Sequence, residues 1–449
     1  MSQETLDRLV VSIQERRLVA FCGAGLSMAQ PSSVPSAQIL AGQVVRDYQD
    51  RALPALPADA TATLEALTEY LWGHDLQQLF VNELVKWRPF RRSPNIGHRT
   101  IADLLTSEAL QFCVTTNYDE LVELSATDLG EDCFDAAYDL DSAARPHLHR
   151  PYIKLHGCVR DKEHTLWCRR QLESPPPVSP VDQELRRRIT SLKTWLAANL
   201  PQKDLLFVGF WSDWHYLNQV LEDCVTPTHV PLVILVDPNS DDVLTTKAPV
   251  LWKWAAASTK FEHIAEKGEV FLDQLRNAFS RNLLTQVLLK AVPGFQAIKT
   301  DAPTPAVTFD GVLTEDLHAL RRDVYGVPAS RIARFSRPDD SMNAVGRAHL
   351  LLRHAGATLE GPRYVTAMGR KVRVINGKTR LISQTKANFA EDPPAVGGLD
   401  DDYVLCAGAT AGEEIHSDVV RESDHPGVVR AGTKARWITL ETATNDGLC

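Results

Sequence analysis

The sequence predicts an α/β fold, a Rossmann-like parallel sheet flanked by helices, followed by a smaller mixed α+β C-terminal domain. Helical patterning separates successive apolar runs, as at 213–224, and this alternation is typical of parallel sheets. Beyond about residue 306 hairpin and turn signals replace the alternation, which predicts the second domain. The apolar runs that suit buried parallel strands lie at 18–22, 110–114, 152–155, 205–208 and 232–236.

Length and composition limit the class of protein. A chain of 449 residues is too long for one ordinary core, so we expect two domains. Its 44% hydrophobic and 23% charged residues are typical of soluble domains, and a formal charge of -9 gives no global attraction to nucleic acid. Because no apolar run approaches the roughly 20 residues of a membrane span, and the polar start does not resemble a signal peptide, we expect a cytoplasmic protein without membrane segments.

The eight cysteines are scattered and form no C-x-x-C pair. Neither a disulfide framework nor a thiolate zinc site is therefore expected. His147, His149 and His156 are close enough in sequence to suggest another metal site, but histidines beside arginines are more often solvated surface, so we expect no metal.

Prolines suggest where the domains divide. The cluster at 175–177 with Pro180 is interpreted as an exposed loop inside the large domain, whereas Pro293, Pro303 and Pro305 mark a boundary. The predicted domains are residues 1–292, closed by a helix at about 270–292, a linker at 293–305, and residues 306–449.

A β-hairpin is predicted inside the C-terminal domain. Residues 372–375 and 378–383 would pair across a type I′ turn at Asn376-Gly377. Basic residues cluster around this stretch, which is usual for a solvated face but also suits an acidic partner or nucleic acid. They are Arg363, Arg370, Lys371, Arg373, Lys378 and Arg380.

The first motif with chemical content is Gly23-Ala24-Gly25-Leu26-Ser27, directly after the first predicted strand. Glycines at this place let backbone N–H groups approach a phosphate without hindrance from a Cβ. The same pattern also makes an ordinary tight turn, and it lacks the third glycine of the dinucleotide fingerprint. Ser27 has no G-x-S-x-G context, so it is not expected to be a hydrolase nucleophile.

Two further motifs follow the next two strands. Thr115-Thr116-Asn117-Tyr118-Asp119 lies at the carboxyl end of the second strand, where open parallel sheets bind ligands, although Asn117 or Asp119 would also serve as a helix cap. His156 ends the third strand and precedes Gly157. A lone histidine is usually structural, but at a strand tip it can titrate near neutral pH and act as a general base.

These three motifs, in this order and together with residues 205–213, resemble the sirtuin-like family, named for silent information regulator two. The resemblance covers about residues 15–240. It implies that Asn117 and His156 are catalytic, with His156 as the base. It also implies a dinucleotide site made by Gly23, Ala24, Gly25, Ser27, Thr116, Asp119, Gly209 and Ser212. The last pair is separated by two residues where the family pattern has one.

The sequence departs from deacetylating sirtuins in two respects. It lacks the paired C-x-x-C motifs of their zinc module, and no Asp-Phe-Arg follows the proline of Val34-Pro35-Ser36. It therefore looks closer to the bacterial branch that cleaves NAD+ in antiphage defence, by abortive infection. That resemblance implies an NAD+ hydrolase that releases nicotinamide and ADP-ribose, or a cyclised product, without zinc.

The resemblance also implies regulation, because an unrestrained NADase would be lethal. Relatives achieve it as homo-oligomers or by docking on a HerA-type ATPase or an Argonaute. Two other functions stay open: a module that senses NAD+ or ADP-ribose without turning it over, and a protein deacylase. The C-terminal domain could serve oligomerisation, partner docking or sensing.

Overall fold

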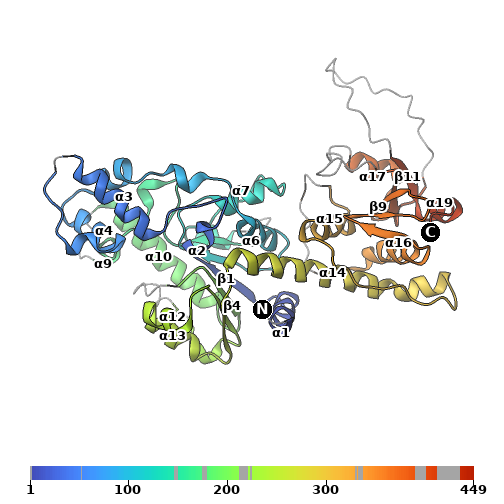
Figure 1. Ribbon diagram of the computed structural model, residues 1–449, viewed down its shortest axis with the longest axis horizontal. Helices are drawn as coiled ribbons and strands as arrows, with labels where there is room; N and C mark the ends of the chain where they lie inside the picture. The colour runs from blue at the N-terminus through green and yellow to red at the C-terminus, as the bar shows by residue number, and fades with distance from the viewer. Residues whose placement is uncertain are drawn as a thin grey trace, which may run out of the picture. The chain divides into compact units, whose positions relative to one another are not determined.

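The computed structural model describes ten stretches of the chain (Figure 1). They are residues 3–51, 53–145, 150–173, 179–211, 221–222, 225–328, 331, 337–389, 401–411 and 435–449. The chain forms two compact units. Unit 1 comprises Met1–Asp128 and Asp132–Leu275, and unit 2 comprises Leu129–Glu131 and Arg276–Cys449.

The two units divide within one long helix, α14 (Gly268–Ile298). The predicted linker at 293–305 therefore begins inside a helix, because Pro293 lies within α14 and does not end it. A proline in a helix removes one backbone hydrogen bond, but Ala291 and Phe295 on either side are buried and their packing holds the helix together. The functional division into residues 1–292 and 306–449 stays a proposal.

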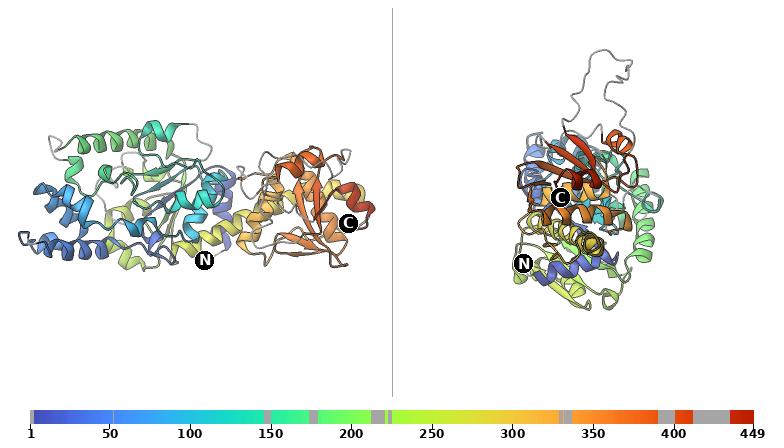
Figure 2. Two further views of the ribbon diagram at one scale, coloured as in Figure 1. Left: turned by 90° about the horizontal axis from the view of Figure 1, so that it is seen from above. Right: turned by 90° about the vertical axis from the view of Figure 1, so that its right-hand side faces the viewer.

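Unit 1 is built on a six-stranded sheet in the order β3-β2-β1-β4-β5-β6, with every neighbouring pair parallel. Helices flank this sheet on both sides (Figure 2). The strands are β1 (Leu18–Cys22), β2 (Cys113–Thr115), β3 (Tyr152–Lys154), β4 (Asp204–Val208), β5 (Val233–Val236) and β6 (Phe261–Ile264). The predicted fold class is confirmed for this unit.

The order of the strands creates a switch point. From β1 the chain adds β2 and β3 on one side, and then β4, β5 and β6 on the other. The connections after β1 and β4 consequently leave the sheet in opposite directions, and this is where a doubly wound sheet opens a crevice for ligands. The tips of β1, β2 and β4 are thus the first place to look for a site.

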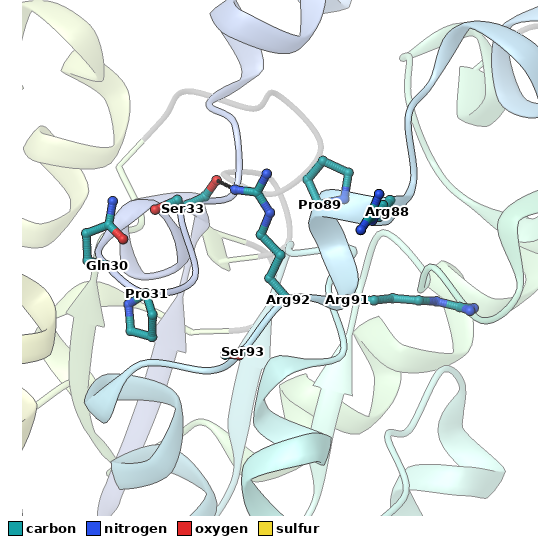
Figure 3. A pocket seen from close by; sticks show the side chains of 8 residues that line it. All are labelled: Gln30, Pro31, Ser33, Arg88, Pro89, Arg91, Arg92 and Ser93. Atoms are coloured by element: carbon teal, nitrogen blue, oxygen red, sulfur yellow. Dashed lines mark hydrogen bonds between the residues drawn. The ribbon is translucent and has the colours of Figure 1, made fainter.

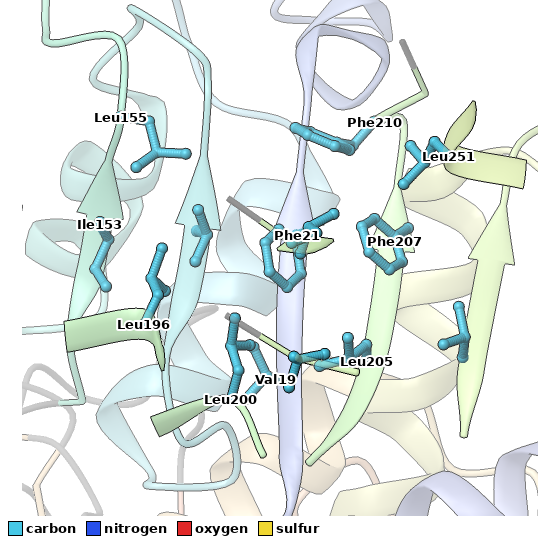
Figure 4. Close-up of a cluster of buried hydrophobic side chains, with 14 of the residues drawn as sticks. Val19, Phe21, Ile153, Leu155, Leu196, Leu200, Leu205, Phe207, Phe210 and Leu251 are labelled. Carbon is cyan, nitrogen blue, oxygen red and sulfur yellow. The ribbon is translucent and has the colours of Figure 1, made fainter. Parts of the chain in front are cut away.

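The main apolar core of unit 1 lies between the sheet and α10 (Pro180–Asn199) (Figure 4). Leu196 and the neighbouring Leu200 pack against alternate residues of β1, Val19 and Phe21, which point to the same face of the sheet. Phe21 stacks on Phe207 of β4 with ring centroids 4.8 Å apart. This packing fixes the tips of β1 and β4 side by side.

Several shorter elements complete unit 1. Before β2 lie α1 (Gln3–Gln14), α2 (Ala24–Met28), α3 (Ala37–Gln49), α4 (Leu64–Gly73), α5 (Gln77–Leu79) and α6 (Ile96–Thr106). After β2 lie α7 (Leu121–Asp128), α8 (Leu140–Ala144), α9 (Arg170–Glu173), α12 (Asp241–Lys247) and α13 (Pro249–Ala256). Short turns of tighter or wider helix are η1 (Asp59–Thr61), η2 (Phe80–Leu84), η3 (Arg88–Arg91), η4 (Lys162–His164) and η5 (Pro227–His229).

A second apolar cluster, formed mainly by residues between α2 and α6, was not predicted. Its aromatic centre joins Phe80, Trp87 and Trp167, and the Trp167 ring stacks on Tyr118 with centroids 4.2 Å apart. Tyr118 lies between Asn117 and Asp119, so this cluster braces the segment that follows β2.

Unit 2 contains a five-stranded mixed sheet in the order β11-β10-β9-β8-β7. Strands β7 (Thr358–Glu360), β8 (Arg363–Val365) and β9 (Lys371–Asn376) are antiparallel, whereas β10 (Tyr403–Ala407) and β11 (Arg436–Thr439) continue parallel to β9. The remaining elements are α15 (Thr314–Tyr325), η6 (Asp340–Met342), α16 (Asn343–His354), α17 (Ile382–Asn388) and α19 (Leu440–Asn445). The predicted mixed α+β domain is confirmed.

The hairpin predicted at Asn376-Gly377 is wrong. Strand β9 pairs antiparallel with β8, which precedes it, and the residues after Gly377 lead into α17. The side chain of Asn376 is buried and donates to the carbonyl of Val324 (3.0 Å), while Gly377 donates its N–H to Ala407 (2.8 Å). The Asn-Gly pair therefore anchors a strand end to α15 and β10, and is not a two-residue turn.

Two residues of the basic cluster have partners inside unit 2. Arg373 pairs with Asp323 at 2.7 Å and Arg363 with Asp401 at 3.3 Å. Both pairs are largely shielded from solvent, which favours a structural role for these two arginines. In the part of the chain that the structure describes, no helix is both long and apolar enough to cross a bilayer.

Candidate functional site

Three glycines let the tips of β1 and β4 approach each other. The N–H of Gly23 donates to the carbonyl of Val208 and the N–H of Gly25 to that of Gly209. A Cβ on Gly23 would lie 2.5 Å from the Gly209 oxygen, and one on Gly25 would lie 2.8 Å from the Gly209 Cα. Gly209 itself has φ +57°, and a Cβ there would lie 2.5 Å from the nitrogen of Leu26. Backbone packing alone thus requires these glycines.

The hydroxyl of Ser27, on the short helix α2, is the centre of a buried hydrogen-bond network. Its Oγ lies 3.0 Å from Nε2 of His98, 3.0 Å from Nδ2 of Asn117 and 2.8 Å from Oδ2 of Asp119. The four side chains are each at most 7% exposed. Residues from α2, α6 and the segment after β2 are thereby held at one point.

The protons in this network can be assigned. Nδ1 of His98 faces the backbone N–H of Asn95 at 3.2 Å and must accept from it, so the proton of the neutral ring is on Nε2. Nε2 then donates to Ser27, Asn117 donates to Ser27, and Ser27 donates to the Asp119 carboxylate. Burial lowers the pKa of His98 to about 4, with the nearby Asp119 carboxylate opposing that effect, so the ring is neutral at physiological pH. The capacity of the Ser27 hydroxyl is fully used.

Asn117 is held in one orientation. Its Nδ2 donates both to Ser27 and to the carbonyl oxygen of Gly23 (3.1 Å), which can only accept. The amide cannot be flipped without losing both bonds, so Oδ1 must point the other way. Oδ1 is buried and accepts no hydrogen bond from any described residue. A buried amide oxygen without a donor is rare and costs about 1–3 kcal/mol, which suggests that a ligand or water completes it.

Asp119 has two structural duties. Its Oδ2 accepts from Ser27, and its Oδ1 accepts from the N–H of Leu121 at 3.3 Å, at the start of α7. The alternative interpretation of Asp119 as a helix cap is therefore compatible with the structure. Asp119 is only 2% exposed, so its carboxylate could contact a ligand only if that ligand reached into the buried network around Ser27.

A buried ion pair supports this segment from below. Lys154, at the end of β3, lies 2.6 Å from Glu123 of α7 and also donates to the backbone oxygen of Asp119. Burial by itself lowers the pKa of Lys154. The attraction of the carboxylates of Glu123 and Asp119 raises this pKa by more than burial lowers it, so the net shift is upward. The lysine thus stays charged and joins β3 to the segment after β2.

His156 does not behave as the sequence suggests. Burial lowers the pKa of His156 to about 3, so the ring does not titrate near neutral pH as expected. Its ring lies beside Tyr118 with centroids 5.8 Å apart, and its backbone oxygen accepts from Leu166. Its assignment as catalytic base stays a prediction.

The remaining predicted site residues differ in exposure. Ala24 and Gly25 are exposed and Thr116 is half-buried. Ser212, His147 and His149 lie outside the described residues, as do the prolines at 175–177 and most of the helix predicted at 213–224. Among the residues that the structure describes, no group of three or more His, Cys, Asp or Glu could hold a metal ion.

Sequence reasoning missed the role of His98 and its neighbour Asn95. Asn95 is the N-cap of α6 and exchanges hydrogen bonds with residue His98, and its Nδ2 also donates to the carbonyl of Leu26 at 2.8 Å. The signal was present as an asparagine three residues before a histidine at a helix start, which is a capping-box pattern. Its contact with Ser27 depends on the tertiary fold.

Part of this chain matches the model of a known domain family. Residues 111–256 match the family described as the SIR2-like domain. No curated protein matches the chain. The match covers the segment from β2 to α13 and includes Asn117, Asp119, His156 and Gly209.

Solved structures similar to this chain include Sir2 complexes. A Sir2–p53 peptide–NAD+ structure shares 13% identity with a TM-score of 0.34, covering 61% of this chain and 97% of the other. A Sir2 homologue–NAD complex shares 15% identity with a TM-score of 0.33, covering 60% of this chain and 91% of the other.

Proposed function

We propose, from the SIR2-like domain that this chain carries, that it binds NAD+ and hydrolyses the bond between nicotinamide and ribose, releasing ADP-ribose. The observation that supports this best is the orphan oxygen of Asn117. It lies at the switch point of a doubly wound sheet, in an orientation fixed by Ser27 and Gly23. A polar atom of this kind is what a site for an attacking water needs.

The chemistry of the reaction matches the small number of polar groups. Nicotinamide leaves as a neutral molecule, so the reaction needs little acid catalysis. The ribose passes through a state with positive charge at C1′, which oriented dipoles and a fixed water stabilise. Oδ1 of Asn117 accepts a hydrogen bond from that water and so directs the water's lone pair toward C1′. The Asp119 carboxylate supplies negative charge close to the cation and holds ribose hydroxyls.

His156 is proposed to accept the proton that the water loses after it attacks C1′. A buried neutral imidazole is in its basic form at physiological pH, and its low pKa makes it a weak base. A weak base is sufficient when the departure of nicotinamide precedes proton loss, since water bound to a cationic carbon is strongly acidic. The remaining cofactor-binding assignments, including Ala24, Thr116 and Ser212, are proposed from the resemblance.

The biological setting is proposed from the same resemblance. The missing zinc cysteines and the missing Asp-Phe-Arg favour an NAD+-depleting effector of antiphage defence over a protein deacylase. Such activity must be restrained until infection, and unit 2 is the candidate for that control, through homo-oligomers or a partner such as a HerA-type ATPase or Argonaute.

The test measures NAD+ binding and nicotinamide release in parallel over a range of protein concentrations. The wild type should release nicotinamide and ADP-ribose in equal amounts. Asn117→Ala should lower kcat at least about 100-fold, because it removes the group that orients the water. Asn199→Ala is the matched control, since its amide only donates to Trp195 at the end of α10. Tight NAD+ binding without nicotinamide release would favour the sensing function, and full activity of Asn117→Ala would reject the assignment.

A further inference from the structure

An arginine-lined pocket lies between the loop that follows α2 and the segment that contains η3 (Figure 3). Its volume is about 880 Å³, and it is formed by the loop after α2 and by η3 with the residues that follow it. Its polar lining comes from Gln30 and Ser33 on one wall and from Arg88, Arg91, Arg92 and Ser93 on the other. None of the residues assigned to the NAD+ site lines it.

The charge of the pocket is positive and only partly balanced. Arg92 donates to the backbone oxygen of Ser33 at 3.0 Å, which leaves its charge uncompensated (Figure 3). Arg91 lies 3.5 Å from Glu120, which is not part of the lining. Arg88 is exposed and pairs with no carboxylate among the described residues. No acidic side chain belongs to the lining.

These features identify a class of ligand. Pockets for small molecules usually have volumes of about 300–1,000 Å³, so this one is large enough for a nucleotide. The planar guanidinium of arginine matches phosphate oxygens in a two-pronged geometry, and a wall with several arginines and no carboxylate favours an anion. We propose that this pocket binds the phosphate or diphosphate group of a nucleotide.

The pocket is coupled to the buried network by short connections. The walls are joined by the hydrogen bond from Ser32 to the backbone oxygen of Ser93 (3.0 Å). A few residues further along, the same two segments meet again through Asn95 and Leu26, and through His98 and Ser27. An anion that draws Arg88 and Arg92 together therefore acts on the segments that hold Ser27.

The phosphate group bound in this pocket could belong to either of two molecules. The anion is either the diphosphate of NAD+ itself, reaching over from the neighbouring site, or a separate nucleotide that modulates that site. Both cases rest on the proposed NAD+ site, the first for the identity of the ligand and the second for what the ligand modulates, whereas binding of the anion itself does not. Inorganic pyrophosphate and ADP are the probes, because both carry the proposed group and neither has a nicotinamide to release.

The experiment measures the binding of pyrophosphate and ADP to the full chain by calorimetry at low and high salt. Arg88→Gln combined with Arg92→Gln should weaken binding at least about ten-fold, because two charge-assisted contacts are lost. Arg187→Gln is the control, since Arg187 is exposed and pairs with Glu184 on α10. Rising salt should weaken binding to the wild type.

Competition separates the two sources. If NAD+ displaces pyrophosphate and the double variant raises KM for NAD+ while kcat is kept, the anion is the diphosphate of the substrate. If pyrophosphate and NAD+ bind together, the ligand is a separate nucleotide; either result supports the pocket. Asn117→Ala should bind pyrophosphate normally, so loss of catalysis and loss of the pocket are distinguishable. Pyrophosphate and ADP that fail to bind, or that bind the double variant as tightly as the wild type, would overturn the proposal.

Discussion

Replacing Ser27 with alanine should destabilise unit 1 far more than the loss of one hydroxyl normally does. The Ser27 Oγ accepts from His98 and Asn117 and donates to Asp119, all within 3.0 Å. Asn117 keeps its bond to Gly23, but the imidazole N–H and one carboxylate oxygen lose their partners in the interior. Each unpaired buried group costs about 1–3 kcal/mol, so we expect about 3 kcal/mol in total.

Urea unfolding at pH 8, followed by circular dichroism and tryptophan fluorescence, measures this loss. Ser125→Ala is the control, because Ser125 is equally buried but its hydroxyl only bonds back to Leu121 within α7. That change should cost less than about 1 kcal/mol, because the carbonyl keeps its helical partner.

A double-mutant cycle tests the cause of the effect. In Ser27→Ala with His98→Leu, the unpaired imidazole N–H no longer exists. The double variant should therefore be more stable than the sum of the single effects predicts, by about 1 kcal/mol or more. The interpretation of Ser27 as the centre of the hydrogen-bond network is wrong if the two losses of stability add. It is also wrong if Ser27→Ala lowers the free energy of unfolding no more than Ser125→Ala does.

Three further predictions follow from the same region. Lys154→Met should cost about 3–5 kcal/mol by leaving the Glu123 carboxylate buried alone, and adding Glu123→Gln should restore part of it in urea unfolding. Gly209→Ala should abolish soluble expression, since it combines a positive φ with a 2.5 Å clash, whereas Gly311→Ala, with a positive φ and open space, should lower the thermal midpoint only slightly. The low pKa of His98 implies that the unfolded chain takes up its proton first. Through His98, stability should decline by up to about 3 kcal/mol as pH falls from 6.5 toward 4, and His98→Leu should remove this part of the decline in unfolding curves. The part that comes from the buried His156 and His349, whose pKa values are also lowered, should remain.

The sheet could be predicted because its strands are buried on both faces. The apolar runs Leu18–Cys22 and Leu205–Val208 contain no polar residue and are buried throughout. Strand β6 was missed because Phe261–Ile264 is a half-buried edge strand that carries Glu262 and His263. Its membership of the sheet depends on pairing with β5, which local sequence does not reveal.

The candidate site was predictable to the extent that strand tips converge in a parallel sheet. That rule alone places Gly23 near Asn117, and the two are joined by a hydrogen bond. It does not reveal His98, which reaches Ser27 from the start of α6. Nor does it reveal that Lys154, a charged residue at the end of an otherwise apolar strand, pairs with Glu123.

The motifs that suggest a function mostly have structural explanations, and this separates strong from weak arguments about the site. Close backbone packing explains Gly23 and Gly209, and a saturated network explains Ser27. Those residues would be needed in this fold even if it bound nothing. Oδ1 of Asn117 is different, because folding fixes its direction and no residue that the structure describes donates to it. Since burying an unpaired oxygen costs stability, a molecule that donates to this atom would offset the cost, and the proposed NAD+ hydrolysis therefore rests on this atom more than on the motif as a whole.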